Sequence, residues 1–392
     1  MNTSSPSTGS RSLAVRLHPA LPGGVGTPPA FEPVEYRDAD WQTAWVRGSL
    51  VHDAPRRAMI KAVLFGLALL ASAWVSATIW FDGPSAPIPA NLLAAAFFVA
   101  TWVGLLLPRS RAFGATLFLG FLAIASAWWL SLEPSNDREW LRDVAHTASA
   151  SIQGDQVTVR NLRNFEYRSE DDFTERWEKR SYDLSRLVGA DLFLCYWGSP
   201  WIAHTIVSWE FSDGPNLAVS IETRKEVGEA YSAVLGFFRQ FELYYVVADE
   251  RDVVGLRTNH RGDECQLYRL TTSPEKSRAV LLDYLAEINR LSHEPRWYNA
   301  ATHNCTTTIR HHAQHVGAGN PWDWRILVNG HIDELGYERG TIDGSLPFDV
   351  LRERSHINER ARAAGDGPDF SERIREGLPA RHGHTDAEAL RR

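Results

Sequence analysis

Residues 62–81 read AVLFGLALLASAWVSATIWF, and residues 88–107 and 112–132 form two further apolar runs without a charged side chain. An α-helix rises about 1.5 Å per residue, so roughly 20 apolar residues cross about 30 Å of hydrocarbon. Each run has about that length, and only short segments separate the three. We therefore predict three transmembrane helices within residues 58–132.

Basic residues lie on one side of the predicted helices. Arg56, Arg57 and Lys61 precede the first helix, and Arg109 and Arg111 separate the second from the third, whereas the first connecting loop carries no basic residue. The positive-inside rule then places the N-terminus in the cytoplasm and the chain after the third helix outside. This pattern predicts a multi-pass protein of a bacterial inner membrane with a periplasmic C-terminal domain.

Composition divides the rest of the chain into three parts. Residues 1–57 begin rich in Ser, Pro and Gly and predict a flexible cytoplasmic tail. Residues 133–352 have a globular composition, and residues 353–392 predict a charged, partly disordered tail. The formal net charge of -7 and the lack of a basic stripe argue against a nucleic-acid partner.

The globular part alternates short strand-like runs with helical patterns. Residues 160–167 are expected to be an extended connection, because this charged region has no apolar stripe wide enough for a buried helix. Runs rich in β-branched and aromatic residues then predict strands at 192–197, 204–211, 217–222, 243–248 and 265–270. Apolar spacing predicts helices at 227–241, 275–291 and 305–316. We expect an α+β domain with an antiparallel sheet packed on helices.

Three cysteines, Cys195, Cys265 and Cys305, leave at least one thiol without an internal partner. A Cys195–Cys265 disulfide would be permitted in an oxidising compartment. Both residues lie in apolar strand-like runs, however, so we expect two buried free thiols.

Cys305 follows Asn304 at the start of a predicted helix, where the helix dipole and unpaired N–H groups favour a thiolate and can stabilise an oxyanion. A nucleophilic thiol needs an imidazole within hydrogen-bond reach and a polar group that orients the ring. His204 begins an apolar strand, and Glu222 lies on the strand opposite it. Because the register is uncertain by one residue, Ser220 and Arg224 are alternative participants. Taken alone, His204 fits a satisfied histidine in the core better than a catalytic base.

A second group of histidines offers a different chemistry. His311 and His315 are four residues apart and would lie on one helix face, as metal ligands do. No carboxylate completes an H-E-x-x-H pattern. We therefore favour solvated histidines and expect neither a metal nor another cofactor.

Several segments together resemble the Lnb N-terminal periplasmic domain family, which is associated with bacterial lipoprotein N-acyltransferases. The matching segments are, in chain order, 159–161 with Phe165 and Tyr167, then 201–204, 220–225, 245–252, 256–259 and 303–306. A histidine strand ahead of a cysteine helix is also similar to the permuted branch of the papain-like and NlpC/P60-like thiol enzymes. The resemblance covers most of residues 155–340 and implies that fold.

The resemblance implies a role for each matching residue. Cys305 would be the nucleophile, His204 the base and Glu222 the third member. Residues expected to bind substrate lie in or beside the same segments; they are Arg224, Tyr298 and Asn304.

The implied reaction is acyl transfer at the membrane surface, with a phospholipid as acyl donor and the N-terminus of a lipoprotein as acceptor. Tethering the domain at the bilayer raises its effective concentration toward both substrates. One alternative is a periplasmic thiol peptidase or amidase that acts on cell-wall peptide, and another is a non-catalytic envelope binding protein. A groove lined by Trp197, Trp201 and Trp209 would favour lipid, whereas a polar cleft would favour peptide.

Overall fold

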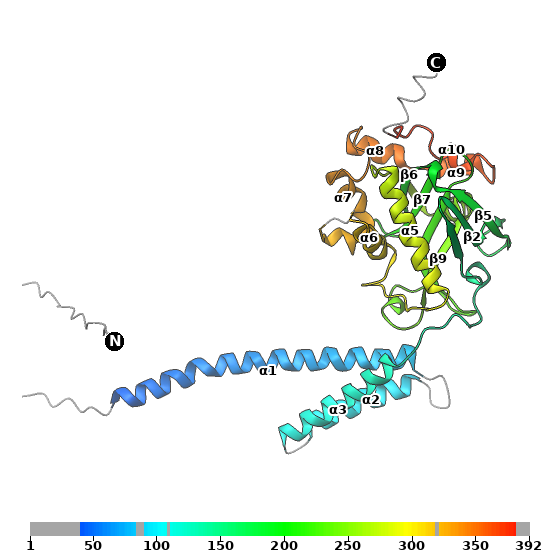
Figure 1. Cartoon of the computed structure of the whole chain (residues 1–392). Helices are drawn as coiled ribbons and strands as arrows, with labels where there is room; N and C mark the ends of the chain where they lie inside the picture. The colour runs from blue at the N-terminus through cyan, green and yellow to red at the C-terminus, as the bar shows by residue number, and fades with distance from the viewer. Residues whose placement is uncertain (1–39, 84–89, 108–109, 318–320, 382–392) are drawn as a thin grey trace, which may run out of the picture. The chain divides into compact units, whose positions relative to one another are not determined.

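The computed structural model describes residues 40–83, 90–107, 110–317 and 321–381 (Figure 1). Residues 1–39 of the predicted cytoplasmic tail and residues 382–392 of the predicted C-terminal tail lie outside the described residues. The chain divides into two compact units, 1–66 and 67–392. The folded domain that follows the apolar helices lies in the second unit.

Three apolar helices precede the domain: α1 (Asp40–Asp82), α2 (Ala90–Leu106) and α3 (Arg111–Leu130). Two stretches, Pro55–Asp82 and Ala112–Leu130, are long and apolar enough to cross a membrane. Only 17% of the most apolar part of each stretch is buried, unlike the core helix of a soluble protein.

We predicted three transmembrane helices. Among the residues that the structure describes, only two helices are long and apolar enough to cross a membrane. Helix α2 has 17 residues and is shorter than the apolar run at 88–107. The sequence has prolines at 89 and 108, and proline restricts helices at both positions. Residues 40–57, predicted to belong to a flexible tail, are instead the first turns of α1.

An eight-stranded sheet forms the centre of the domain, with strand order β1-β2-β9-β8-β7-β6-β10 and β5 paired to β2. The five predicted strands are all present, as β6 to β10. Residues 160–163, expected to be a connection, belong to β2. The bounds are β1 Ser149–Gln153, β2 Gln156–Arg163, β3 Glu166–Tyr167, β4 Phe173–Thr174, β5 Trp177–Asp183, β6 Leu187–Tyr196, β7 Ala203–Phe211, β8 Leu217–Arg224, β9 Glu242–Asp249 and β10 Glu264–Arg269.

The sheet is mixed, which corrects the expectation of an antiparallel one. Strands β2 and β9 pair in parallel through Arg163 and Ala248, while the other pairings are antiparallel. Parallel neighbours need a long crossover, and here β3 to β8 lie between the two strands in the chain. The α+β class is confirmed.

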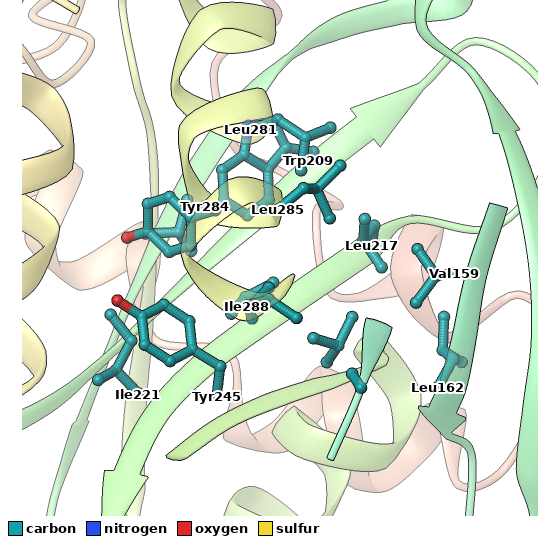
Figure 2. Packing of buried hydrophobic residues seen from close by; sticks show 14 of the residues in the cluster. Val159, Leu162, Trp209, Leu217, Ile221, Tyr245, Leu281, Tyr284, Leu285 and Ile288 are labelled. Carbon is teal, nitrogen blue, oxygen red and sulfur yellow. The ribbon is translucent and has the colours of Figure 1, made fainter. Parts of the chain in front are cut away.

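Helix α5 (Pro274–Leu291) packs on one face of the sheet, as its apolar spacing predicts. Figure 2 shows Leu281, Tyr284, Leu285 and Ile288 of this helix against strand residues. Trp209 is fully buried there and donates its indole N–H to the Ser277 carbonyl at 3.0 Å. Trp209 is thus a core residue and lines no groove.

The opposite face is covered by short helices from the middle and the end of the chain, α4 (Glu250–Gly255), α9 (Asn358–Ala364) and α10 (Phe370–Arg373). Ile357, Phe370 and Ile374 are almost completely buried. The remaining helices are α6 Cys305–His315, α7 Ile332–Glu338 and α8 Phe348–Ser355.

Folded structure therefore continues past residue 352, where a charged tail was expected. The reason is that some of the charges are buried in pairs. Arg375 bonds Asp191 at 2.7 Å and Glu250 at 2.6 Å, and both carboxylates are fully buried. Arg381 bonds Asp191 and Glu210.

The helix expected at 227–241 is absent, and only a short turn forms at Leu235–Phe237. Gly228 has a φ of 94°, which takes the chain out of the helical region. The backbone of this segment bonds another loop instead: Ala300 donates to the Gly236 carbonyl and Tyr298 to the Phe241 carbonyl. Periodicity alone did not reveal this competing pairing.

A disulfide joins Cys195 of β6 to Cys265 of β10, so the expectation of two free thiols is wrong. The two residues are direct partners in the antiparallel register of these strands. Sequence alone does not give that register, and without it the apolar surroundings favoured free thiols.

The disulfide closes a long loop, with a sequence separation of 70 residues. Replacing both Cys195 and Cys265 with alanine should lower the free energy of unfolding by about 3–4 kcal/mol, because the open chain gains entropy when unfolded. Denaturant titration of the purified protein measures this, with Cys305→Ala as the control. Equal stability of the double variant and the control would contradict the assignment.

Candidate active site

Cys305 is the first residue of α6, and it is buried. Asn304 caps this helix: its side-chain oxygen accepts the Thr307 N–H at 2.9 Å, and the Thr307 hydroxyl accepts the Asn304 N–H at 3.0 Å. This reciprocal cap fixes the first turn and the thiol on it. The predicted start of the helix is confirmed.

His204 lies at the start of β7 and faces two polar residues of the neighbouring strand β8. Its Nε2 is 2.6 Å from the Ser220 hydroxyl and 3.5 Å from Glu222 Oε1. Ser220 donates to Glu222 Oε1 at 2.7 Å, so its oxygen is left to accept from the imidazole. The imidazole thus reaches the carboxylate both directly and through Ser220.

Arg257 holds the carboxylate from the other side. Its guanidinium lies 3.3 Å from Glu222 Oε1 and 3.0 Å from Asp263. Burial opposes ionisation of Glu222, but the hydrogen bond with His204 and the charge of Arg257 outweigh it and hold the pKa well below the ordinary value. Glu222 is therefore an anion at neutral pH. Arg257, which helps to keep it charged, was not among the site residues expected from the sequence.

The thiol and the imidazole lie within hydrogen-bonding reach. Burial alone would raise the pKa of Cys305, but hydrogen bonds with His204 and Thr205 outweigh it and lower the pKa to about 6. Burial and the charge of Arg257 depress the His204 pKa, but hydrogen bonds with Cys305 and Glu222 outweigh them and raise it. Both shifts favour a thiolate beside an imidazolium.

Asn329 ties the two halves of the pair together. Its side-chain oxygen accepts the Ala203 N–H at 2.9 Å, and its amide donates to the Ala203 carbonyl at 2.6 Å and to the Thr306 hydroxyl at 2.5 Å. Ala203 precedes His204, and Thr306 follows Cys305. Nothing in the sequence pattern singles out this asparagine, because its role depends on a contact between distant segments.

The three residues expected to bind substrate have different surroundings. Tyr298 is buried in the same apolar cluster as Cys305, and burial together with the Cys305 charge raises its pKa. The Asn304 amide donates to the Ala300 carbonyl at 2.7 Å, so both ends of its side chain serve the helix cap.

Arg224 supports the fold and makes none of the contacts that assemble the thiol and imidazole. It is buried, donates to the carbonyls of Val144 and Ala145 at 3.0 and 2.9 Å, and lies 4.2 Å from the centre of the Trp140 ring. These contacts fasten the segment ahead of β1 to the sheet.

Large aromatic side chains are exposed on loops next to the pair. Trp197 and Trp201 are 41% and 55% exposed and lie between β6 and the start of β7. Tyr231 as a whole is also exposed. Its hydroxyl is partly buried, and this burial together with the charge of Cys305 raises the pKa of Tyr231. Trp197 and Trp201 therefore expose apolar surface on the segment that leads to His204, and the groove expected to contain them stays a prediction.

Two histidines of α6, His312 and His315, bond to the same carboxylate. His312 and His315 lie 2.7 and 3.2 Å from Asp283, and His312 also meets the Tyr245 hydroxyl at 2.8 Å. Within the described ranges, no group of three or more His, Cys, Asp or Glu residues is placed to hold a metal ion.

A cavity of about 990 Å³ lies elsewhere, between the turn after β7 and the C-terminal helices. Its lining is mainly polar, and it includes neither Cys305, His204 nor Glu222. Despite its size, this cavity is therefore not part of the candidate active site around Cys305.

Residues 173–330 match the family model described as the Lnb N-terminal periplasmic domain, which confirms the resemblance over that segment. His204, Ser220, Glu222, Cys305 and Asn329 all lie inside it. No curated protein and no solved structure matches the chain. The family description and the apolar N-terminal helices agree with a membrane-anchored protein that has a periplasmic domain.

Replacing Arg224 with alanine should lower the free energy of unfolding by about 2–4 kcal/mol, because the Val144 and Ala145 carbonyls lose their donor. Denaturant titration gives this value, and Lys225→Ala is the neighbouring control, with a change of about 0.5 kcal/mol or less. The pH dependence of Cys305 alkylation should stay the same. A changed alkylation profile with unchanged stability would instead give Arg224 a role at the site.

The low pKa of Cys305 predicts how its alkylation by iodoacetamide depends on pH. Thiolate should be present above about pH 6 and be lost below it. In His204→Ala, loss of the partner should move the midpoint upward by at least about two pH units. Mass spectrometry of the labelled protein measures the rates. A wild-type midpoint near that of an ordinary thiol would rule out the ion pair.

Proposed function

From the match of residues 173–330 to the Lnb N-terminal periplasmic domain family, we propose that this protein is a membrane-anchored periplasmic acyltransferase. It transfers an acyl chain from a phospholipid to the N-terminus of a lipoprotein through a thioester on Cys305. The observation that carries the proposal is the buried Cys305 thiol held against His204, with its pKa lowered to about 6. We propose that the arrangement is a permuted papain-like site, in which the geometry of the thiol and imidazole is kept although their order in the chain is reversed.

In the first step, the Cys305 thiolate attacks the carbonyl carbon of a phospholipid ester. A C–S bond forms, the C–O bond to the glycerol breaks, and His204 gives its proton to the leaving oxygen, so that a lysophospholipid departs. Backbone N–H groups of the first turn of α6 face the developing oxyanion. Nε2 of His204 bonds Ser220 and Glu222, which leaves Nδ1 for the sulfur.

In the second step, the α-amine of the lipoprotein attacks the thioester carbonyl. An amide bond forms, the C–S bond breaks, and His204 takes the proton that the amine loses. The Glu222 carboxylate stabilises the imidazolium that is present before the first step and restored in the second, because the carboxylate remains charged. The thiolate is regenerated, and no cofactor takes part.

The proposed location follows from the basic residues and the disulfide. With α2 as a third crossing beside the two longer helices, the positive-inside rule puts the N-terminus in the cytoplasm and the domain in the periplasm of a bacterial inner membrane. The 17 residues of α2 reach the lower end of the length that spans a bilayer. The Cys195–Cys265 disulfide supports an oxidising compartment such as the periplasm.

A lipid donor is favoured over a cell-wall peptide by the exposed Trp197 and Trp201 on the segment that leads to His204, and by the exposed Tyr231, whose pKa the Cys305 charge raises. Aromatic side chains of this kind suit a surface where apolar chains meet water. A thiol peptidase would use the same Cys305 and His204, so the acceptor has to be identified by its product.

The test is mass spectrometry of lipoprotein N-termini from a strain that lacks its own N-acyltransferase and expresses this protein. N-acylated peptides should appear with the wild type and decline by about two orders of magnitude or more in Cys305→Ala. His311→Ala, an exposed position on the same helix, is the matched control and should keep the product.

Membrane fractions must contain each variant in equal amounts. Equal N-acylation by Cys305→Ala and wild type would exclude thioester catalysis. If the wild type yields no N-acylated peptide, lipoprotein is not the acceptor.

A further inference from the structure

An apolar cavity of about 140 Å³ lies between α6, α7 and the sheet. Its walls include six aliphatic side chains, from α6, from α7 and from the segments on either side of α7: Ile309, Ala313, Ile326, Ile332, Leu335 and Ile342. Leu192 and Leu270 add apolar surface from the sheet side. Arg310 and Arg339 also contribute to the lining, but most of the wall is apolar, and such a pocket favours an apolar ligand.

The cavity reaches the first turn of the helix that carries Cys305. Thr306, the next residue, lines it, and the Thr306 hydroxyl lies 3.9 Å from the Cys305 sulfur. Thr205, the residue after His204, also lines it and contributes to lowering the pKa of Cys305. A chain bonded to the sulfur therefore reaches the cavity by passing these two threonines.

We propose that this cavity, the acyl pocket, holds the first part of the acyl chain that is bonded to Cys305 in the thioester. The inference rests on the proposed function and names where its substrate binds. A cavity of about 150 Å³ with a similar aliphatic lining accommodates benzene. The acyl pocket therefore takes roughly six carbons of a linear chain, and the remainder extends beyond it.

The rigid position of the pocket follows from the contacts already described. Asn329, which lies between Ile326 and Ile332 in the chain, bonds the Thr306 hydroxyl and the Ala203 backbone. The same residue thus positions the thiol, the imidazole strand and one wall of the pocket. A chain in the pocket would hold the thioester carbonyl in a fixed place relative to His204.

Alkyl methanethiosulfonates test the pocket without requiring acyl transfer. The thiolate attacks the sulfenyl sulfur, a mixed disulfide with the alkyl group forms, and methanesulfinate leaves. Cys305 is the one cysteine outside the disulfide, so the full-length protein in detergent is labelled at a single position. Intact-mass spectrometry gives the rate for methyl, isobutyl, hexyl and dodecyl reagents, each divided by its rate with glutathione.

The relative rate should rise by roughly a factor of two to four per methylene up to hexyl, as apolar groups leave water, and then level off. Ala313→Phe fills the pocket and should abolish the preference for hexyl over methyl. Gln314→Phe places the same side chain on an exposed position of α6 outside the pocket and should keep it. Leu335→Ala enlarges the pocket and should move the plateau to longer chains, which provides a test if Ala313→Phe does not fold.

Equal relative rates for methyl and hexyl reagents in the wild type would overturn the acyl pocket. A plateau already at isobutyl would assign the cavity to a peptide side chain and also overturn it. The rates of Cys305 modification do not depend on acyl transfer. A result against the acyl pocket is therefore distinct from a result against lipoprotein N-acylation. A chain-length preference that survives both Ala313→Phe and Leu335→Ala would place the alkyl chain elsewhere.

Discussion

The position of β7 between β6 and β8 is the constraint on which the candidate site depends. Antiparallel pairing sets His204 opposite Cys195 on one side and beside Ser220 and Glu222 on the other. The disulfide then fixes β6 to β10. The position of Cys195 in β6 therefore determines both the disulfide partner in β10 and the place of His204 in β7. A slip of one residue would turn His204 to the other face of the sheet and separate it from its partners.

Around this strand, the structure brings together groups that are far apart in the chain. Asn329 bonds the residue before His204 and the residue after Cys305, while Arg257 holds the Glu222 carboxylate. The thiol, the imidazole and the carboxylate therefore keep their relative positions through contacts outside themselves. Such preorganisation suits a site whose reacting groups must remain aligned through two successive steps.

Local patterns predicted the elements whose own spacing fixes them. The apolar repeat of α5, the start of α6 at Cys305 and the five central strands follow from side-chain period and end signals. The pairing of Cys305 with His204 was implied by the family resemblance. Periodicity failed at residues 227–241, where backbone pairing with the loop at 298–300 replaces a helix. It also missed Arg257 and Asn329, because pairing between distant segments is not encoded in local spacing.

Arg375 and Arg381 join a strand near the middle of the domain to the end of the described chain. Asp191 and Glu250 are fully buried, and a buried carboxylate without its cation is strongly destabilising. The sheet therefore reaches its final stability only after residue 381 has been synthesised and has joined the rest of the domain. Folding of the domain is completed late, because the last described segment supplies the cations that neutralise its buried carboxylates.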